Sequence, residues 1–73
     1  MSFTPAEMAK LVVFMERKFK CKGIALKKRE KAGDSVEVMI DGEYIGLIYK
    51  DEEDGEISYD FNMAILDIDL NET

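Results

Sequence analysis

Apolar residues near the start of the chain recur with the period of an α-helix. They stand at positions i, i+3, i+4, i+7 and i+11, namely Met8, Leu11, Val12, Met15 and Phe19, and this spacing places them on one stripe. Thr4 can cap the helix, Pro5 suits its first position, and Glu7 completes a capping box with Thr4. Gly23 offers a left-handed residue that can end the helix. The pattern predicts a helix over residues 5–21.

After residue 23 the apolar positions change to a period of two, which is typical of strands with one buried face. The alternating segments predict four strands, at residues 24–29, 35–40, 43–50 and 56–63. Asp41-Gly42 separates the second from the third and predicts a two-residue hairpin, because both residues of a type I′ turn need a positive φ. We therefore expect an α+β fold: one N-terminal amphipathic helix packed on a four-stranded antiparallel meander, αββββ with order 1-2-3-4, as a single domain over residues 1–73.

The turns also predict which residues of neighbouring strands pair. Counted from the first hairpin, Val38 lies opposite Ile45, and a loop over residues 51–55 brings Lys50 opposite Glu56. A slip by one residue would turn the whole apolar set to solvent, so the pattern specifies the register. The inner face of the sheet then collects Ile24, Leu26, Val36, Val38, Ile40, Ile45, Leu47, Tyr49, Ile57, Tyr59, Phe61 and Met63.

The alternation changes parity near Ala64. From Ile57 to Ile65 the alternating apolar residues have odd numbers, whereas Leu66, Ile68 and Leu70 have even ones. A bulge or bend near Ala64 would reconcile the two patterns. Two alternatives stay open for residues 64–70: they extend strand four, or they fold over the outer face of the sheet.

The outer face of the predicted sheet carries an apolar island of Met39, Tyr44 and Ile48. Methionine and aromatic residues are typical of the cores of protein interfaces, so the island is a candidate partner contact, for another protein or for self-association. Phe14 lies roughly 100° off the helix stripe. It is either a flanking core residue or a second partner contact.

The charges are sorted along the chain. Residues 1–32 hold nine basic and three acidic residues, and residues 33–73 hold one basic and thirteen acidic ones. On the meander, the basic residues gather at the helix end and first strand, at the edge opposite to many acidic ones. This basic edge predicts docking of an acidic protein partner, with nucleic acid as the alternative; the net charge of −6 makes nucleic acid less favoured. The candidate contacts are Arg17, Lys18, Lys20, Lys27 and Arg29.

The residue types present argue against an enzyme. The chain has no histidine, the commonest general base and metal ligand. We expect its only cysteine, Cys21, to be an inert or half-buried thiol. The acidic segment 51–56 lacks the spacing of a calcium loop. We therefore expect no catalytic residues, no cofactor and no metal site. The lack of disulfides and of a long apolar run favours a cytoplasmic protein without a membrane span.

Two segments, DGEYIGLIY from Asp41 and EDGEISYDFNMAILDIDL from Glu53, resemble a family of short bacterial proteins known only as a domain of unknown function. The resemblance covers about residues 8–70. It implies a small bacterial protein and transfers no activity, cofactor or site residue. The sequence as a whole predicts a non-enzymatic protein-interaction or accessory module; the alternative is a nucleic-acid-associated accessory protein that uses the basic edge.

Overall fold

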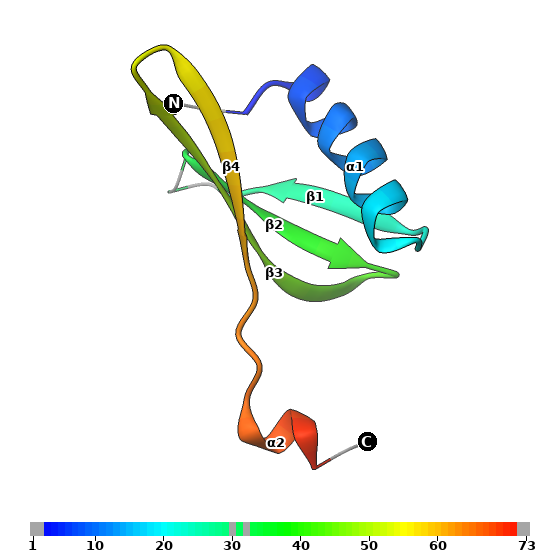
Figure 1. Cartoon of the computed structure of the whole chain (residues 1–73). Helices are drawn as coiled ribbons and strands as arrows, with labels where there is room; N and C mark the ends of the chain where they lie inside the picture. Colours follow the sequence, from blue (N-terminus) through cyan, green and yellow to red (C-terminus); the bar gives the residue numbers. More distant parts are fainter. Residues whose placement is uncertain (1–2, 30, 32, 72–73) are drawn as a thin grey trace.

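The computed structural model describes residues 3–29, 31 and 33–71. Its strands form one antiparallel sheet in the order β1-β2-β3-β4, and α1 lies against one face of that sheet (Figure 1). This arrangement confirms the predicted α+β class and the meander. The elements are α1 (Pro5–Phe19), β1 (Ile24–Lys28), β2 (Ser35–Ile40), β3 (Glu43–Glu53), β4 (Glu56–Asn62) and a short helix that the sequence did not predict, α2 (Asp67–Leu70).

Helix α1 begins where the capping signals predict. The Thr4 hydroxyl accepts a hydrogen bond from the Glu7 backbone N–H at 3.1 Å, and the Glu7 carboxylate accepts one from the Thr4 N–H at 2.9 Å. The helix ends at Phe19, two residues earlier than predicted, because Lys20 already takes the left-handed cap conformation, with φ of 55°. Gly23 also has a positive φ, 86°, but lies beyond the cap. The capping box therefore predicted the first turn of the helix correctly, whereas Gly23 predicted a helix end too late in the chain.

The pairing of β2 with β3 follows the prediction for two residues and then departs from it. Met39 pairs with Tyr44 as expected from the Asp41-Gly42 turn. A bulge between Val38 and Met39 leaves Ile45 as an extra residue, so Val38 pairs with Gly46 instead of Ile45. From Gly46 onward the parity of β3 is inverted relative to the prediction.

Gly46 is the residue that the bulge brings against β4. A Cβ atom added there would lie 2.5 Å from the backbone oxygen of Asn62 and 2.9 Å from the ring of Phe61. Only glycine lets the two strands approach this closely. The sequence pattern missed the bulge because a glycine carries no apolar side chain to mark its face.

The predicted register of the second hairpin is also wrong. Glu53 pairs with Glu56 around a two-residue turn at Asp54 and Gly55, and Lys50 pairs with Tyr59 rather than with Glu56. Asp54 and Gly55 both have positive φ, 52° and 81°, so this is an Asp-Gly turn of the same kind as the first hairpin. The acidic residues 51–53 belong to β3. A strand can carry these charges here because this end of the hairpin is exposed on both faces.

The buried core consists of six apolar side chains on α1, the sheet and the segment before α1: Phe3, Met15, Ile24, Val36, Val38 and Ile48. The prediction that Ile48 lies on the outer face is wrong, since the bulge turns it inward and leaves it 2% exposed. Conversely, Leu47 and Tyr49 do not belong to this core, whereas Ile45 is half-buried and packs against it, as predicted. Phe3 joins the core just ahead of the helix cap, a place where a hydrophobic staple is expected.

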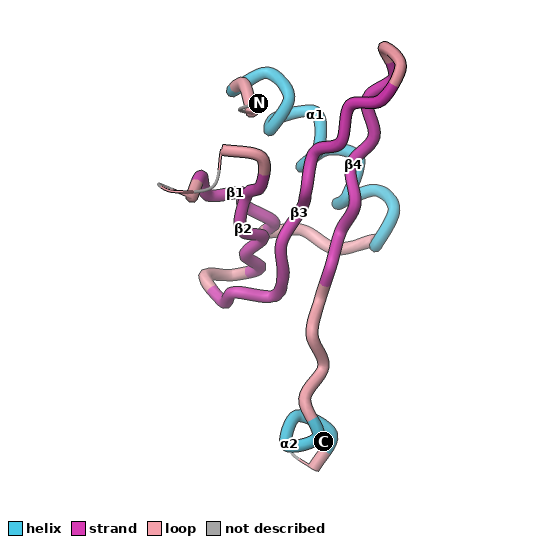
Figure 2. Tube along the Cα trace, turned by 90° about the vertical axis from the view of Figure 1, so that its left-hand side faces the viewer, coloured by secondary structure: helices cyan, strands magenta, loops and turns pink. Residues whose placement is uncertain are grey.

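The chain beyond β4 forms a projecting segment, residues 63–71, which we call the C-terminal arm. Strand β4 ends at Asn62, and the arm leads to α2 away from the sheet, as both views show (Figures 1 and 2). Neither predicted alternative holds, because residues 64–70 neither extend strand four nor cover the outer face. The arm exposes more than half of the side chains of Met63, Ile65, Leu66 and Ile68.

None of the helices in the described part of the chain has both the length and the apolar character that a membrane crossing requires.

Candidate functional site

One helix is too narrow to cover the inner face of this sheet. An α-helix with its side chains is about 10 Å wide, whereas four strands spaced at about 4.8 Å span roughly 15–20 Å. Helix α1 approaches the sheet at β1, the edge opposite β4. The inner face near β4 is therefore left uncovered, although the alternation of apolar residues continues there.

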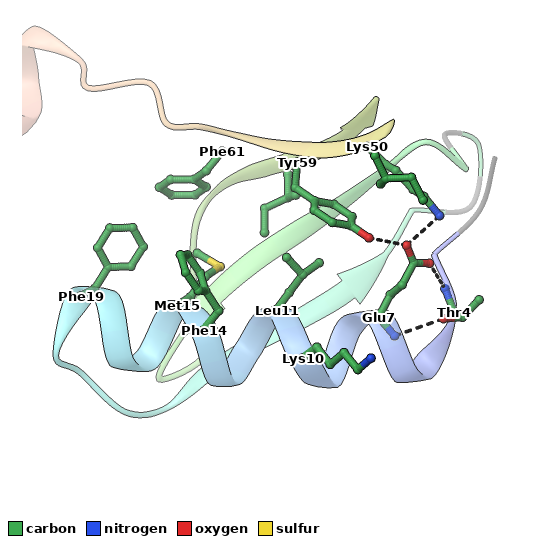
Figure 3. A pocket seen from close by; sticks show the side chains of 12 residues that line it. Thr4, Glu7, Lys10, Leu11, Phe14, Met15, Phe19, Lys50, Tyr59 and Phe61 are labelled. Atoms are coloured by element: carbon green, nitrogen blue, oxygen red, sulfur yellow. Dashed lines mark hydrogen bonds and ion pairs between the residues drawn. The ribbon is translucent and has the colours of Figure 1, made fainter. Parts of the chain in front are cut away.

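The uncovered area forms a groove between α1 and the β3–β4 hairpin (Figure 3). Its volume is about 810 Å³. We call it the α1–β4 groove. Apolar side chains at its mouth are exposed to solvent: Phe14 and Phe19 from α1 by 59% and 52%, and Ile57 and Phe61 from β4 by 51% and 38%. The groove is lined by Thr4, Glu7, Lys10, Leu11, Phe14, Met15, Phe19, Ile48, Lys50, Ile57, Tyr59 and Phe61.

An aromatic pair closes one end of the groove. The rings of Phe19 and Phe61 lie 6.0 Å apart between centroids, tilted by 52°, so the last turn of α1 contacts β4 here (Figure 3). Such tilted arrangements are favourable for aromatic pairs. The pair fixes the distance between helix and strand at this end.

A polar cluster closes the other end. The Tyr59 hydroxyl donates to the Glu7 carboxylate at 2.5 Å, and the Lys50 ammonium forms an ion pair with the same carboxylate oxygen at 2.7 Å (Figure 3). The ammonium also lies 5.9 Å from the centre of the Phe3 ring, which is within cation–π distance. Both side chains of the ion pair are largely buried. The cluster joins the first turn of α1 to β3 and β4.

These contacts move two pKa values away from neutrality. The hydrogen bonds from Lys50, from Tyr59 and from the Thr4 backbone lower the pKa of Glu7 to about 2. The hydrogen bond to the Glu7 carboxylate raises the pKa of Tyr59 above its ordinary value of 10, and partial burial adds to the rise. At neutral pH Glu7 is therefore ionised and Tyr59 is protonated, so the polar end has one fixed charge state.

Basic side chains flank the groove on the helix side. Lys10 lines the groove itself, and a shallow hollow on the outer surface of α1 is lined by Ala9, Lys10, Val13, Phe14 and Arg17. Phe14 borders both depressions, so its ring stands on the ridge between them. Phe14 was predicted either to flank the core or to contact a partner. Its exposed side chain is not among those packed against the core, and contact with a partner stays a prediction.

The structure disperses the apolar island that the sequence predicted. Met39 and Tyr44 are paired as expected, and Tyr44 is 54% exposed. Ile48, in contrast, is turned to the inner face and lines the floor of the α1–β4 groove. The proposed contact role of Met39 and Tyr44 stays a prediction.

The predicted basic residues occupy two places. Arg17 and Lys20 line a hollow beside Cys21 at the end of α1, next to the exposed Lys18. Lys27 is exposed on β1 opposite Glu37, as expected, whereas the Arg29 guanidinium donates to the buried Ser35 hydroxyl at 3.1 Å. Arg29 thus has a structural role at the β1–β2 end, and contact with a partner stays a prediction for all five.

Sequence reasoning missed the groove because it assumed that every inner-face residue is covered. The signal that identifies it is a mismatch of widths: the pattern assigns four strands to the inner face but only one helix to cover them. The acidic residues 51–56 form the tip of the β3–β4 hairpin, and the described residues contain no group of three or more acidic or cysteine side chains placed to hold a metal ion.

The chain belongs to the family described as "Protein of unknown function (DUF3126)", whose model matches residues 7–69. This finding confirms the resemblance drawn from the sequence. No curated protein and no solved structure matches the chain.

Proposed function

We propose that this member of the DUF3126 family is a non-enzymatic protein-interaction module that holds an apolar segment of a protein in the α1–β4 groove. The observation that carries the proposal is the exposure of aromatic and aliphatic side chains on both walls of a concave site. Soluble proteins rarely leave such surface open unless it binds something.

The construction of the groove favours binding without rearrangement. Phe14 stands on a regular helix and Phe61 on a paired strand. The Phe19–Phe61 contact and the Glu7 cluster hold the two walls at a set distance from both ends. A preorganised site loses little conformational entropy on binding, which strengthens the affinity.

The charges around the groove indicate the chemistry of the partner. Lys10 and Arg17 flank the exposed ring of Phe14, and both are positively charged at neutral pH. A segment with apolar side chains next to aspartate or glutamate would match this arrangement, because complementary charges speed encounter and orient the partner. We therefore propose an apolar, acidic peptide segment as the ligand class.

The protonation states of the polar cluster support a role without catalysis. A general acid or base works best with a pKa near the working pH. Glu7 has a pKa of about 2, and the pKa of Tyr59 is raised above 10, so neither exchanges protons readily at neutral pH. The sequence also lacks histidine.

Site-specific photocrosslinking in the native host tests this proposal. A photoreactive phenylalanine analogue replaces Phe14 in the full chain, and the matched control carries it at Tyr49, which is also exposed but does not line the groove. We expect a discrete protein adduct from position 14 and none of that size from position 49. Absence of any position-14 adduct, with the labelled chain present and folded, would contradict the proposal.

A further inference from the structure

We infer that the segment bound in the α1–β4 groove is the C-terminal arm of a second copy of this chain, exchanged reciprocally between two copies. The inference rests on the proposed function and adds the identity of the partner. Four independent properties of the arm support it: exposed apolar residues, length, charge and direction.

The arm has the composition of a bound segment but projects away from the sheet (Figures 1 and 2). Ile65, Leu66 and Ile68 are each about three-fifths exposed, and helix α2 approaches none of the other described elements. Four helical residues are far too few for a stable isolated helix. The Asp69 carboxylate accepts a hydrogen bond from the Leu66 N–H at 3.0 Å, which preforms one turn. Docking on an apolar surface would stabilise this turn.

The length of the arm matches the length of the groove. The groove runs beside α1, whose fifteen residues span about 22 Å at 1.5 Å per residue. Residues 63–66 belong to no helix or strand and cover about 13 Å when extended, and the four residues of α2 add about 6 Å. A bound arm would therefore reach along most of the groove.

The charges of the arm and of the groove are opposite. The arm carries Asp67 and Asp69 between its apolar residues. Lys10 lines the helix side of the groove, and Arg17 lines the neighbouring shallow hollow. The other open face of the sheet offers a poorer match, because Lys27 there lies opposite Glu37 and Asp60 adds a further negative charge. Charge thus selects the groove.

The overall dimensions also indicate a missing contact. The chain exposes 5789 Å², whereas a compact monomer of 8.3 kDa exposes about 4,600 Å². Its radius of gyration is 13.2 Å, against about 11 Å for a compact domain of this length. In a dimer with exchanged arms, a two-fold axis makes the two arm–groove contacts identical. The surface of one such contact is therefore buried twice in the dimer. The excess of exposed surface over that of a compact monomer is of the size that a stable dimer buries at its interface.

The direction of the arm favours a second copy over the arm's own groove. Strand β4 runs along the groove through Ile57 and Phe61, and the chain then continues away from the body (Figures 1 and 2). A return to its own groove would need a reversal just after Asn62, where residues 63–66 contain no turn. A neighbouring copy related by a two-fold axis needs no such reversal.

Sedimentation of full-length variants tests the exchange. Phe14→Glu disables the groove and Ile68→Glu disables the arm; both sites are exposed, so the fold is expected to survive, which circular dichroism checks. Tyr49→Glu is the matched control, because Tyr49 is exposed and does not line the groove. We expect wild type and Tyr49→Glu to sediment as dimers and each of the other two variants as monomers. An equimolar mixture of Phe14→Glu and Ile68→Glu should form a heterodimer, because one intact arm meets one intact groove.

Other outcomes would overturn the exchange, and each can be told apart from a failure of the proposed function. A dimer that survives Ile68→Glu is not held by the arm, and one that survives Phe14→Glu is not held by the groove. A monomeric wild type also overturns the exchange between copies. If Ile68→Glu then shifts groove resonances in NMR spectra of that monomer, the arm binds its own groove. If the photocrosslink from position 14 joins a different protein, the groove still binds a partner and only its identity as a second copy is wrong.

Discussion

The hydroxyl of Tyr59 in β4 donates a hydrogen bond to the carboxylate of Glu7 in α1, across 52 residues of sequence and a distance of 2.5 Å. The same carboxylate caps the start of the helix and pairs with Lys50 of β3. One side chain thereby links three elements. It closes the polar end of the groove while the other end rests on an aromatic contact.

Acid should destabilise the protein through Glu7. Its pKa is lowered from 4.5 to about 2 in the folded state, so the unfolded chain binds this proton first as the pH falls. The stabilisation is complete above about pH 4.5 and is lost progressively as the pH falls toward 2. Urea unfolding at a series of pH values measures it. In Glu7→Gln the slope between pH 5 and 2 should be shallower; an unchanged slope would show that Glu7 is not the group responsible.

Alkali should act on the other partner of that hydrogen bond. The pKa of Tyr59 is raised in the folded state, so its contribution is present below about pH 10 and is lost as the pH rises through the folded value. Absorbance of tyrosinate during titration checks this: the wild type should show an ionisation step above pH 10. In Tyr59→Phe this step should vanish. Its persistence there would show that Tyr59 is not the group responsible.

Ile48 and Tyr44 should respond very differently to truncation, although the alternation of the sequence places both on the outer face. Ile48 is 2% exposed, so Ile48→Ala should lower the free energy of unfolding by about 2–5 kcal/mol. Tyr44 is 54% exposed, and Tyr44→Ala should cost less than about 1 kcal/mol. Chemical denaturation measures both changes. Equal losses at the two positions would mean that the bulge is misplaced.

Gly46→Ala should weaken the pairing of β3 with β4. The new methyl group would meet the backbone oxygen of Asn62 at 2.5 Å, and backbone cannot move aside as a flexible side chain can. We expect a loss of about 1–3 kcal/mol, typical of overpacking. Hydrogen exchange should accelerate for amides shared by β3 and β4, while the β1–β2 pair keeps its protection. Uniform acceleration across the sheet would indicate global unfolding instead.

Thr4→Ala should remove half of the capping box. The hydroxyl of Thr4 accepts the Glu7 N–H, and losing such a cap costs about 0.5–2 kcal/mol. Thr4→Ser keeps the hydroxyl and should stay within a few tenths of a kcal/mol of wild type. Thermal unfolding of the two variants side by side gives the comparison. A serine variant as unstable as the alanine variant would point to the lost methyl group rather than to the cap.

Much of the fold follows from local chemistry that is visible in the sequence. Thr4, Pro5 and Glu7 mark the helix start through hydrogen bonds within one turn. Asp41-Gly42 specifies a hairpin through the positive φ of two adjacent residues. A period of 3.6 and then of two separates helix from strands. These signals act over a few residues, so α1, the four strands and their order could all be predicted.

Tertiary structure alone decided the register of β3, the groove and the course of the arm. The bulge at Ile45 depends on how closely β4 approaches Gly46, a contact between strands that no local pattern encodes. The groove exists because a single helix is narrower than four strands. The pattern of elements implies this mismatch, but only the packing of α1 at β1 places the open area beside β4. The meeting of Glu7, Lys50 and Tyr59 requires α1 to pack beside the β3–β4 hairpin, a contact between segments far apart in the sequence. Local hydrogen bonding and periodicity thus determined the elements, whereas packing between distant segments determined which side chains the protein offers to a partner.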